Sequence, residues 1–343
     1  MKRLFALVRG AVVVVVLIAS CAPLPEFPFA AHADLAPPRI VSLLFADPER
    51  LAVTFDEPCT VVEGSVIPGE TLADEIHASV TDQTLTFLFG APPDPAREHM
   101  VEAQVSDGAG NHLRFVARFY GVNEHLPELL INEFTTQGSG KHPDLVELRV
   151  LTAGNLAGAC LYEGIAGDWS QRFVFPDVEV AAGDYIVVHF KPEGIPEEID
   201  ETTSTGLSGG YDAHPEAWDF WVPDGNGLSG NNGVLTLCEN PVGGIIDAVL
   251  YSNRTSASDE RYRGFGSTAV MERADALVAA GAWIAPEGAV RPEDAINPED
   301  STATRSISRM RTGSDTNSRL DWHITPTRGL TAGYENEDGV YEP

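Results

Sequence analysis

Short segments in which apolar and polar residues alternate constrain the fold of this chain more than any other feature. Leu51, Val53 and Phe55 alternate with small or polar residues, and the pattern returns over 85–89, 101–105 and 113–119. A period of two places each apolar set on one face of a β-strand. The 343 residues also include 32 Gly and 24 Pro, which favour turns. We therefore expect an all-β fold of two Ig-like β-sandwich modules in tandem.

The first module is expected over 38–121. Asp47-Pro48-Glu49 and the Gly-rich segment 107–111 predict tight turns between its strands. Asp107 and Asn111 could instead be calcium ligands, but a calcium ion takes about six to eight oxygens, so we favour the turn role. The segments 51–58 and 105–111 resemble bacterial Ig-like repeats of surface proteins. That resemblance implies a spacer or a binding surface.

The second module is expected over 127–334. Short segments rich in β-branched and aromatic residues predict strands at 145–150, 185–190, 234–238 and 245–251. The segment 181–184 predicts a turn that leads into a strand, and Asn231-Asn232-Gly233 predicts a hairpin turn.

An ordered series of segments carries a second resemblance. The series comprises 129–134, 143–148, 155–158, 173–176, 181–188, 228–237, 245–251, 306–309 and 315–322. In this order the segments resemble the lamin-tail domain, an Ig-like sandwich of nuclear lamins and of many exported bacterial proteins. The match is interrupted by insertions at 191–227 and 252–305, and residues 335–343 are expected to form an acidic tail. Within the second insertion, Val270, Ala274, Leu277 and Val278 have helical spacing, and Gly281 could end that short helix.

The N-terminus predicts export. Basic residues precede an apolar run at 11–19, which is the order of a signal peptide, here 1–20. The run ends at Ile18-Ala19-Ser20-Cys21, which resembles the lipobox of bacterial lipoproteins and implies lipidation of Cys21. The Pro-rich stretch 21–37 is typical of a tether. The alternative is ordinary secretory cleavage with an incidental cysteine. We expect attachment to the cell envelope at the outer membrane, and the sequence leaves open which side of it the protein faces.

The formal net charge of −29 limits the partners. It opposes binding to nucleic-acid phosphates, and it opposes adsorption to anionic membrane surfaces, so the membrane is contacted through the lipid. Three cysteines remain besides Cys21. Cys160 and Cys238 fall in the same module, where a disulfide or two buried thiols are equally open, and Cys59 is left over.

Residues suited to catalysis are sparse. The sequence has no P-loop of the form GxxxxGK[ST] and no HExxH motif. His142, His189, His214 and His323 lack the spacing of metal ligands, so we favour surface or structural roles for them and for Asp144. Glu133, Glu147 and Asp247 could supply an acid–base pair, but turn capping or pairing with Arg is favoured. No catalytic residue, metal or cofactor is therefore predicted.

Trp218, Phe220 and Trp221 form the strongest candidate binding segment. Exposed aromatics beside carboxylates could hold a sugar or a protein; otherwise these residues cover the core. The chain is interpreted as a non-catalytic envelope lipoprotein that binds a protein or glycan partner through loops of the second module. The alternative is an exported hydrolase or a hydrolase accessory with a metal site formed by the insertions 191–227 and 252–305.

Overall fold

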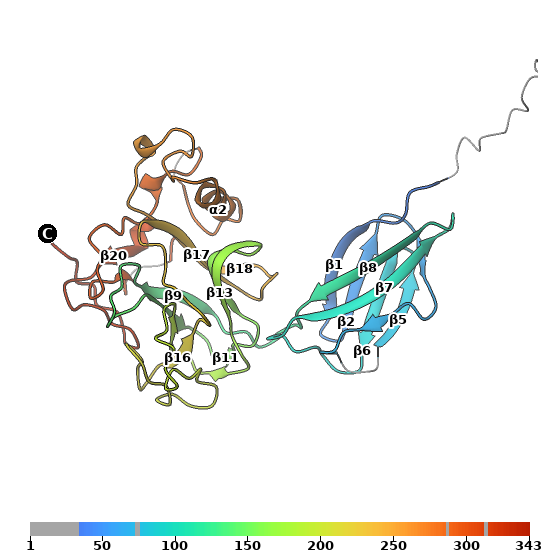
Figure 1. The fold of residues 1–343 in the computed structure, drawn as a ribbon, viewed down its shortest axis with the longest axis horizontal. Coiled ribbons are helices and arrows are strands. Elements are labelled where there is room, and N and C mark those ends of the chain that lie inside the picture. Colours follow the sequence, from blue (N-terminus) through green and yellow to red (C-terminus); the bar gives the residue numbers. More distant parts are fainter. Residues whose placement is uncertain (1–33, 73–75, 286–287, 312–314) are drawn as a thin grey trace, which may run out of the picture.

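The computed structural model describes residues 34–72, 76–285, 288–311 and 315–343, and these form two β-modules joined end to end (Figure 1). The expected signal peptide, Cys21 and most of the expected tether lie outside the described residues. The all-β prediction is confirmed: strands dominate, and the one α-helix of the described ranges is α2 (Thr268–Ala279). None of the described helices has the length and apolar character needed to cross a membrane.

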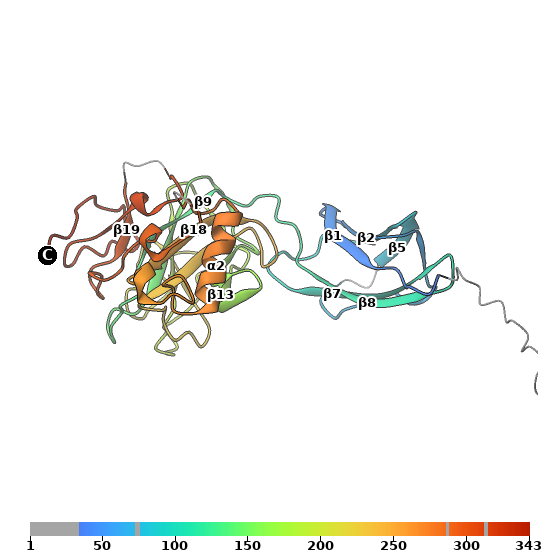
Figure 2. The same ribbon diagram turned by 90° about the horizontal axis from the view of Figure 1, so that it is seen from above.

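The first module is a sandwich of two sheets. One sheet has the order β1 (Ile40–Asp47), β2 (Arg50–Phe55), β6 (Thr84–Phe89) and β5 (Ile76–Thr81), and the other comprises β3 (Cys59–Val61), β7 (His99–Asp107), β4 (Ile67–Pro68) and β8 (His112–Phe119), with β7 at its centre. Figure 2 shows them as two layers. Leu51, Val53 and Phe55 all point into the core between the sheets, as the alternation predicts.

Both predicted turns of this module are confirmed. The Glu49 amide donates to Asp47 Oδ1 (3.1 Å) between β1 and β2. Between β7 and β8, Asp107 Oδ1 accepts the amides of Ala109 and Asn111 at 2.9 and 2.8 Å. Gly110 has φ +89°, a left-handed conformation that glycine adopts without steric cost.

The second module has two larger sheets. The six-stranded sheet has the order β16 (Trp218–Trp221), β15 (Tyr185–His189), β10 (Leu145–Val150), β9 (Leu129–Phe134), β19 (Ile307–Arg309) and β20 (Trp322–Ile324). The four-stranded sheet has the order β13 (Asp168–Val174), β12 (Cys160–Ile165), β17 (Asn232–Cys238) and β18 (Ile245–Ser252). A two-stranded ribbon, β11 (Gly154–Asn155) with β14 (Glu179–Val180), and the 3-10 turns η1 (Ser256–Ser258), η2 (Pro292–Asp294) and η3 (Arg319–Asp321) complete it. Neighbouring strands are antiparallel except β15 and β16, which are parallel.

One continuous core lies between these two sheets. Phe134 sits near its centre, with ring centroids 5.6 Å from Tyr251 of β18 and 5.5 Å from Trp322 of β20. The interior strands β10 and β17 are buried along almost their whole length. Both faces of these strands are covered, so polar side chains are buried as well, Glu147 in β10 and Thr236 in β17.

The helix predicted in the second insertion is confirmed as α2. Ser267 caps its start by accepting the Val270 amide (3.2 Å). The helix ends just before Gly281, as predicted, and Gly281 has φ +72°. Ala274 and Leu277 are fully buried, and the helix lies against the four-stranded sheet (Figure 2), in contact with β12 and β17.

The hairpin expected at Asn231-Asn232-Gly233 is wrong. Asn232 and Gly233 begin β17, and the turn between β17 and β18 lies at 239–244, where the Glu239 amide donates to the Gly244 carbonyl (3.0 Å). Gly233 is required for packing: a Cβ there would lie 2.4 Å from Tyr251 Oη. The glycine therefore makes room for an aromatic ring and does not supply a turn.

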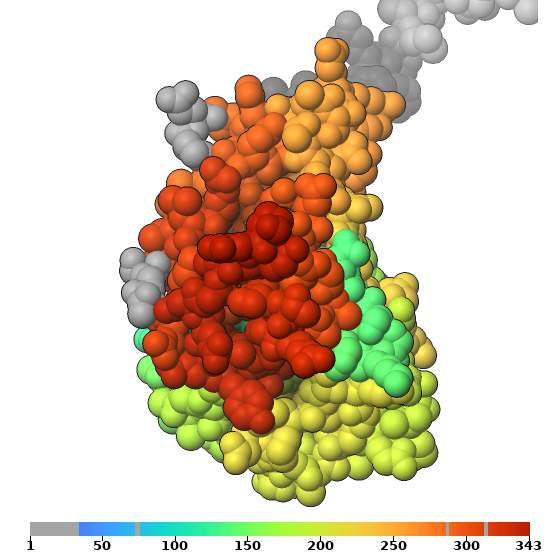
Figure 3. All heavy atoms as spheres, turned by 90° about the vertical axis from the view of Figure 1, so that its left-hand side faces the viewer, coloured from blue at the N-terminus to red at the C-terminus, as the bar shows by residue number. Residues whose placement is uncertain are grey.

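Residues 335–343, expected as an acidic tail beyond the second module, pack against that module. Asn336 is buried, and its Nδ2 donates to the carbonyls of Asn132 (3.0 Å) and Arg309 (2.8 Å). The Tyr341 amide donates to the carbonyl of Ile324 (2.8 Å). Figure 3 shows these last residues, in dark red, spread flat over one face of the second module. The module therefore extends beyond 334.

The linker between the modules is fixed to the second one. Asn123 Nδ2 donates to the carbonyls of Asn155 (2.7 Å) and Ala157 (2.9 Å), and the Asn155 amide donates back to the His125 carbonyl (2.8 Å). A Cβ at Gly158 would lie 2.4 Å from the Pro95 carbonyl oxygen of the first module. The two modules therefore touch at this junction.

Candidate functional site

The predicted aromatic binding segment is buried, and this corrects the assignment of Trp218, Phe220 and Trp221 to partner binding. These residues form β16 at the edge of the six-stranded sheet. Phe220 is fully buried against Phe173 and Phe175, and Trp221 is 6% exposed. Trp218 is half-buried and donates from Nε1 to Asp184 Oδ2 (3.1 Å). Rings that cover the core in this way are not free to hold a ligand.

Carboxylates from the first insertion cap the outer edge of β16. The Asp219 amide donates to Glu201 Oε2 (3.0 Å), and the Trp221 amide donates to Asp200 Oδ1 (2.8 Å). Burial raises the pKa of Asp200. An open strand edge would expose unpaired amides to other chains, so these acidic residues serve the fold and not a ligand.

The four histidines considered as metal ligands do not meet at a common site. His142 Nδ1 bonds Asp212 Oδ1 (2.9 Å), and the fully buried His189 bonds Asp219 Oδ1 (2.8 Å). The His214 ring packs edge-on against Tyr334, and His323 Nε2 meets the Glu337 carbonyl (3.0 Å). Asp144 accepts the amides of Gly138 and Leu228. Each residue holds a local turn or strand, as the sequence favoured.

Glu133 and Glu147 face each other across β9 and β10. Glu133 Oε1 accepts from Ser306 Oγ (2.5 Å) and Oε2 from the Thr331 amide (2.9 Å), while Glu147 Oε2 accepts the Gly333 amide (2.5 Å). Burial raises the pKa of Glu133 to about 7 and that of Glu147 well above its ordinary value, the latter also because Glu133 lies beside it. The pair anchors the C-terminal segment.

Arg309 is the centre of the second buried charge cluster. Its Nη2 donates to Asp247 Oδ2 (2.7 Å), its Nη1 to Asp315 Oδ1 (2.8 Å) and its Nε to the Ile131 carbonyl (2.9 Å). The guanidinium also lies 4.6 Å from the ring centroid of Trp322. Burial raises the pKa of Asp247 to about 6, and Arg309 opposes that rise. The expected pairing of Asp247 with an arginine is confirmed.

This cluster supports a rigid loop at 315–321. Asp321 Oδ2 accepts the amides of Thr316 (2.9 Å) and Ser318 (3.2 Å), and its Oδ1 accepts from Thr316 Oγ1 (2.6 Å). The Ile284 amide donates to the Asn317 carbonyl (2.7 Å), which ties the second insertion to the loop. These bonds fix a loop that presents the side chain of Leu320 to solvent.

Two hollows adjoin on either side of Leu320, and we name them together the Leu320 cleft. The first, of about 290 Å³, is lined by Ile284, Asp294, Thr316, Ser318, Arg319 and Leu320. The second, of about 310 Å³, is lined by Ala295, Ile296, Asn297, Arg319, Leu320, Trp322, His323 and Ile324. Leu320 is 77% exposed and Ile284 55% exposed. An apolar surface beside preformed hollows can hold apolar side chains of a partner.

Sequence reasoning missed this cleft. Leu320 stands alone between charged residues, and Ile284 lies in an insertion more than thirty positions away. A single leucine in a polar stretch gives no periodic signal. The cleft exists only because the second insertion folds back onto the loop before β20.

The three cysteines within the described residues are unbonded thiols. Cys160 and Cys238 are fully buried, and Cys59 is buried in the core of the first module. Burial raises the pKa of Cys160 to about 12 and that of Cys238 to about 11. Buried thiols were one of the two alternatives that the sequence left open.

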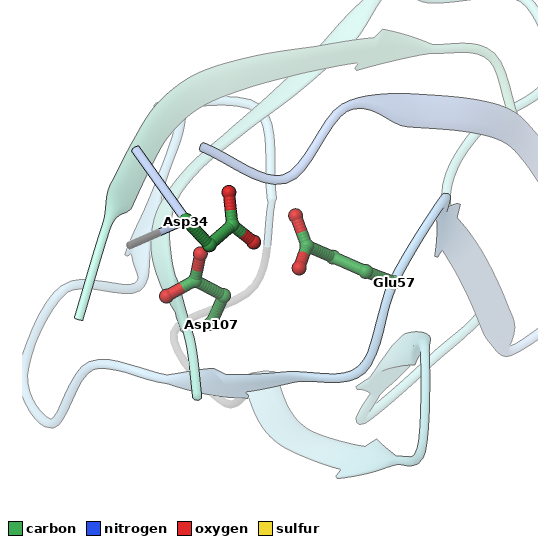
Figure 4. Close-up of side chains that lie close together, drawn as sticks. All are labelled: Asp34, Glu57 and Asp107. Carbon is green, nitrogen blue, oxygen red and sulfur yellow. The ribbon is translucent and has the colours of Figure 1, made fainter. Parts of the chain in front are cut away.

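The first module holds the one group of three potential metal-ligating side chains found among the described residues. The carboxylates of Asp34, Glu57 and Asp107 point toward one another (Figure 4) and lie within 4.8 Å. Burial, followed by the charges of Asp107 and Asp34, raises the pKa of Glu57. Both oxygens of Asp107 already accept bonds within the turn, Oδ2 from Asn111 Nδ2 (2.7 Å). We therefore assign Asp107 and Asn111 the turn role.

The family comparison places its match in the second module. Residues 127–324 match the model of the family TP_1001_2nd, described as "protein second domain". A protein of Treponema pallidum (strain Nichols), described as "Uncharacterized protein", is 28% identical over an alignment of 225 positions that covers 58% of this chain. The chain spans 57% of the length of that relative.

Two solved structures are similar at low scores. A DUF4876 family protein from Bacteroides thetaiotaomicron is 11% identical with a TM-score of 0.29, covering 84% of this chain and 95% of its own. Dimeric latent PorU from Porphyromonas gingivalis is 13% identical with a TM-score of 0.19, covering 62% of this chain and 20% of its own. Neither score is high enough to support an argument.

Proposed function

The chain belongs to the TP_1001_2nd family, and we propose that it is a non-catalytic lipoprotein of the cell envelope whose second module binds a protein partner at the Leu320 cleft. The observation that carries the proposal is the exposed Leu320 between two hollows, on a loop that the Arg309 cluster holds rigid. A preformed surface loses little conformational entropy on binding, so even a modest apolar contact can contribute affinity.

A protein suits this cleft better than a glycan does. Sugar sites commonly offer an exposed aromatic face, but Phe220 and Trp221 are buried and Trp322 is 7% exposed. The accessible apolar groups are the aliphatic side chains of Leu320 and Ile284. These match the aliphatic or aromatic side chains of a polypeptide, which commonly anchor protein interfaces.

The use of the acidic residues supports a binding role over a catalytic one. Glu198 Oε1 accepts the Glu193 amide (2.6 Å), Glu201 Oε1 the Leu207 amide (2.6 Å), and Glu163 Oε1 the Ser229 amide (2.8 Å). The many carboxylates thus satisfy backbone groups of long loops that no strand pairs. Much of the acidic composition has this structural explanation.

Two parts of the proposal rest on sequence. We propose that the second module is a lamin-tail-like sandwich, on the ordered segments 129–134 through 315–322, and that the first is a bacterial Ig-like spacer. We also propose that Cys21 carries a lipid, because the basic and apolar segments before it have the order of a lipoprotein leader. The first module would then hold the Leu320 cleft away from the membrane.

The binding test uses a displayed peptide library selected on the full chain. Peptides enriched on the chain are measured by fluorescence polarisation against the variants Leu320→Asp and Val242→Asp. Val242 is 72% exposed in the turn 239–244, so it matches Leu320 in exposure and chemistry. We expect Leu320→Asp to weaken the selected peptides at least about tenfold, about 1.4 kcal/mol, and Val242→Asp to leave them unchanged.

Equal loss in both variants, or none in either, contradicts the proposal. A glycan array run on the same three proteins provides the second arm. Glycan binding that persists in Leu320→Asp would place the partner elsewhere and in another class.

The anchoring test is independent of the cleft. Cells that produce the full chain are labelled with an alkyne fatty acid, and the Cys21→Ser variant serves as the control. We expect label and membrane association in the unchanged chain and their loss in the variant. A soluble, unlabelled parent chain would refute lipid attachment and leave the cleft proposal standing.

A further inference from the structure

Cys160 and Cys238 lie directly opposite each other in the antiparallel pair β12 and β17. Both belong to one small apolar cluster with Tyr162, so their side chains leave the sheet on the same face. Directly opposed residues in such a pair have Cα atoms about 4.5 or 5.5 Å apart, and a disulfide accepts about 4.4–6.8 Å. The backbone therefore already meets the requirement of a bond.

We infer that Cys160 and Cys238 form an intramolecular disulfide when the chain folds in an oxidising compartment. This inference rests on the export proposed above. The two residues are thiols in the structure. Forming the bond requires rotation of their side chains and no change in the strand register. Neighbouring pairs such as Leu161 and Leu237 keep that register fixed within the core.

The bond must form while the chain folds. Both thiols are fully buried once β12 and β17 have paired, so an oxidant cannot reach them. Burial also raises both pKa values far above neutrality, and the thiolate is the reactive form. In the unfolded chain a thiol has a pKa of about 8.5, so exchange is available only before the sheet closes.

The chemistry is thiol–disulfide exchange. The Cys160 thiolate attacks a sulfur of a small-molecule or protein disulfide, forms a mixed disulfide and releases one thiol of the oxidant. The Cys238 thiolate then attacks the Cys160 sulfur, forms the Cys160–Cys238 bond and expels the second thiol. Two cysteine thiols are oxidised, one external disulfide is reduced to two thiols, and the two cysteine protons pass to the released thiolates.

Cys59 is excluded from this pairing by its place in the fold. It lies in β3, in the separate core of the first module. Once that module has folded, Cys59 has no cysteine opposite it: its partner across β7 is Asp107. Cys59 therefore stays a thiol and serves as an internal control.

The test refolds the full chain with and without an oxidant. The reduced chain is unfolded in guanidinium, then diluted into mixed reduced and oxidised glutathione or into reduced glutathione alone. The chain is then quenched with acid and unfolded, the free thiols are alkylated, and peptides are mapped by mass spectrometry. We expect a linked Cys160–Cys238 peptide in the first sample only, with Cys59 alkylated in both. The linked chain should melt about 5 °C or more above the reduced chain.

Three comparisons sharpen this result. Oxidised glutathione added after refolding reaches the two thiols only when the sheet transiently opens, so it should form the bond at least about tenfold more slowly. Cys160→Ser and Cys238→Ser should each abolish the linked peptide, and Cys59→Ser should preserve it. A natively folded chain with both thiols alkylated after oxidative refolding overturns the inference, and so does preferential linkage to Cys59.

Failure of the export proposal gives a different result. If the chain does not refold in vitro, the same mapping is applied to chain recovered from cells that export it with its own leader. A chain that links in glutathione but is found reduced and unprocessed in the cytosol argues against export and leaves the pairing intact. Exported, folded chain with both thiols free overturns the disulfide.

Discussion

Replacing Arg309 with Met should destabilise the second module strongly. The guanidinium donates to Asp247, Asp315 and the Ile131 carbonyl, and its side chain is only 9% exposed. Met keeps the apolar stem but leaves the buried Asp247 without its cation. Breaking a buried ion pair from one side costs about 3–5 kcal/mol.

The assay follows from where the tryptophans lie. All five are at positions 169–322, in the second module, so their fluorescence reports the unfolding of that module alone. For a urea slope of about 2–3 kcal/mol/M, the midpoint should fall by about 1–2.5 M. Arg311→Met is the matched control, because Arg311 is half-exposed and its ion pairs with Glu335 and Asp338 measure 3.5 and 4.0 Å. Such surface pairs contribute about 0–1 kcal/mol.

The loss should also depend on pH. The folded-state pKa of Asp247 is about 6, above its ordinary value of 3.8, so ionisation of this group opposes folding. Its contribution to stability falls as the pH rises from about 4 to 6. Without Arg309 that pKa rises further, so the variant should lose more stability at pH 8 than at pH 5. Equal midpoint shifts for the two variants, or a loss independent of pH, would refute this account of the cluster.

Three further predictions follow from the packing of the second module. Burial raises the folded-state pKa of Glu133 to about 7, so the free energy of unfolding should fall as the pH rises from about 4.5 to 7. Glu133→Gln should reduce this pH dependence, measured by urea unfolding at each pH, and an unchanged pH dependence would contradict the assignment. Leu277→Ala should cost about 2–5 kcal/mol by the same fluorescence assay, while Leu320→Ala stays within about 0.5 kcal/mol; equal costs would show that the helix is not packed as described. Gly333→Ala should destabilise the packing of the C-terminal segment, because the residue has φ +86° and its Cβ would lie 2.3 Å from His214 Cγ. Limited proteolysis should then cleave the segment faster than in the parent chain, and cleavage at the same rate would contradict this contact.

The elements that the sequence predicted well are those with a local physical signal. Leu51, Val53 and Phe55 alternate with a period of two, and the structure buries all three in one core. The helix α2 was visible from its apolar spacing and from Gly281, which ends it. Turns with Asp and Gly were visible for the same reason, since side-chain capping and positive φ are settled within four or five residues.

The errors arose where one segment meets another that is distant in the chain. Asn232 and Gly233 have the composition of a turn, but Gly233 faces the ring of Tyr251 inside a sheet. Trp218, Phe220 and Trp221 have the composition of a binding loop, but they add a parallel strand to β15. The acidic tail has the composition of a solvated end, but Asn336 is fixed by contacts with Asn132 and Arg309.

By itself, the sequence determined that this chain is all-β, where several of the longer strands run, where the short helix lies, and which face of the alternating strands is buried. Only the tertiary structure decided where the acidic residues act and which apolar residues remain exposed. Periodicity reports which side of a strand is buried, because that depends on the backbone alone. The Arg309 cluster and the Leu320 cleft depend on residues brought together from 131, 247, 284 and 315–323. A pattern within one short segment cannot show that such distant segments come into contact.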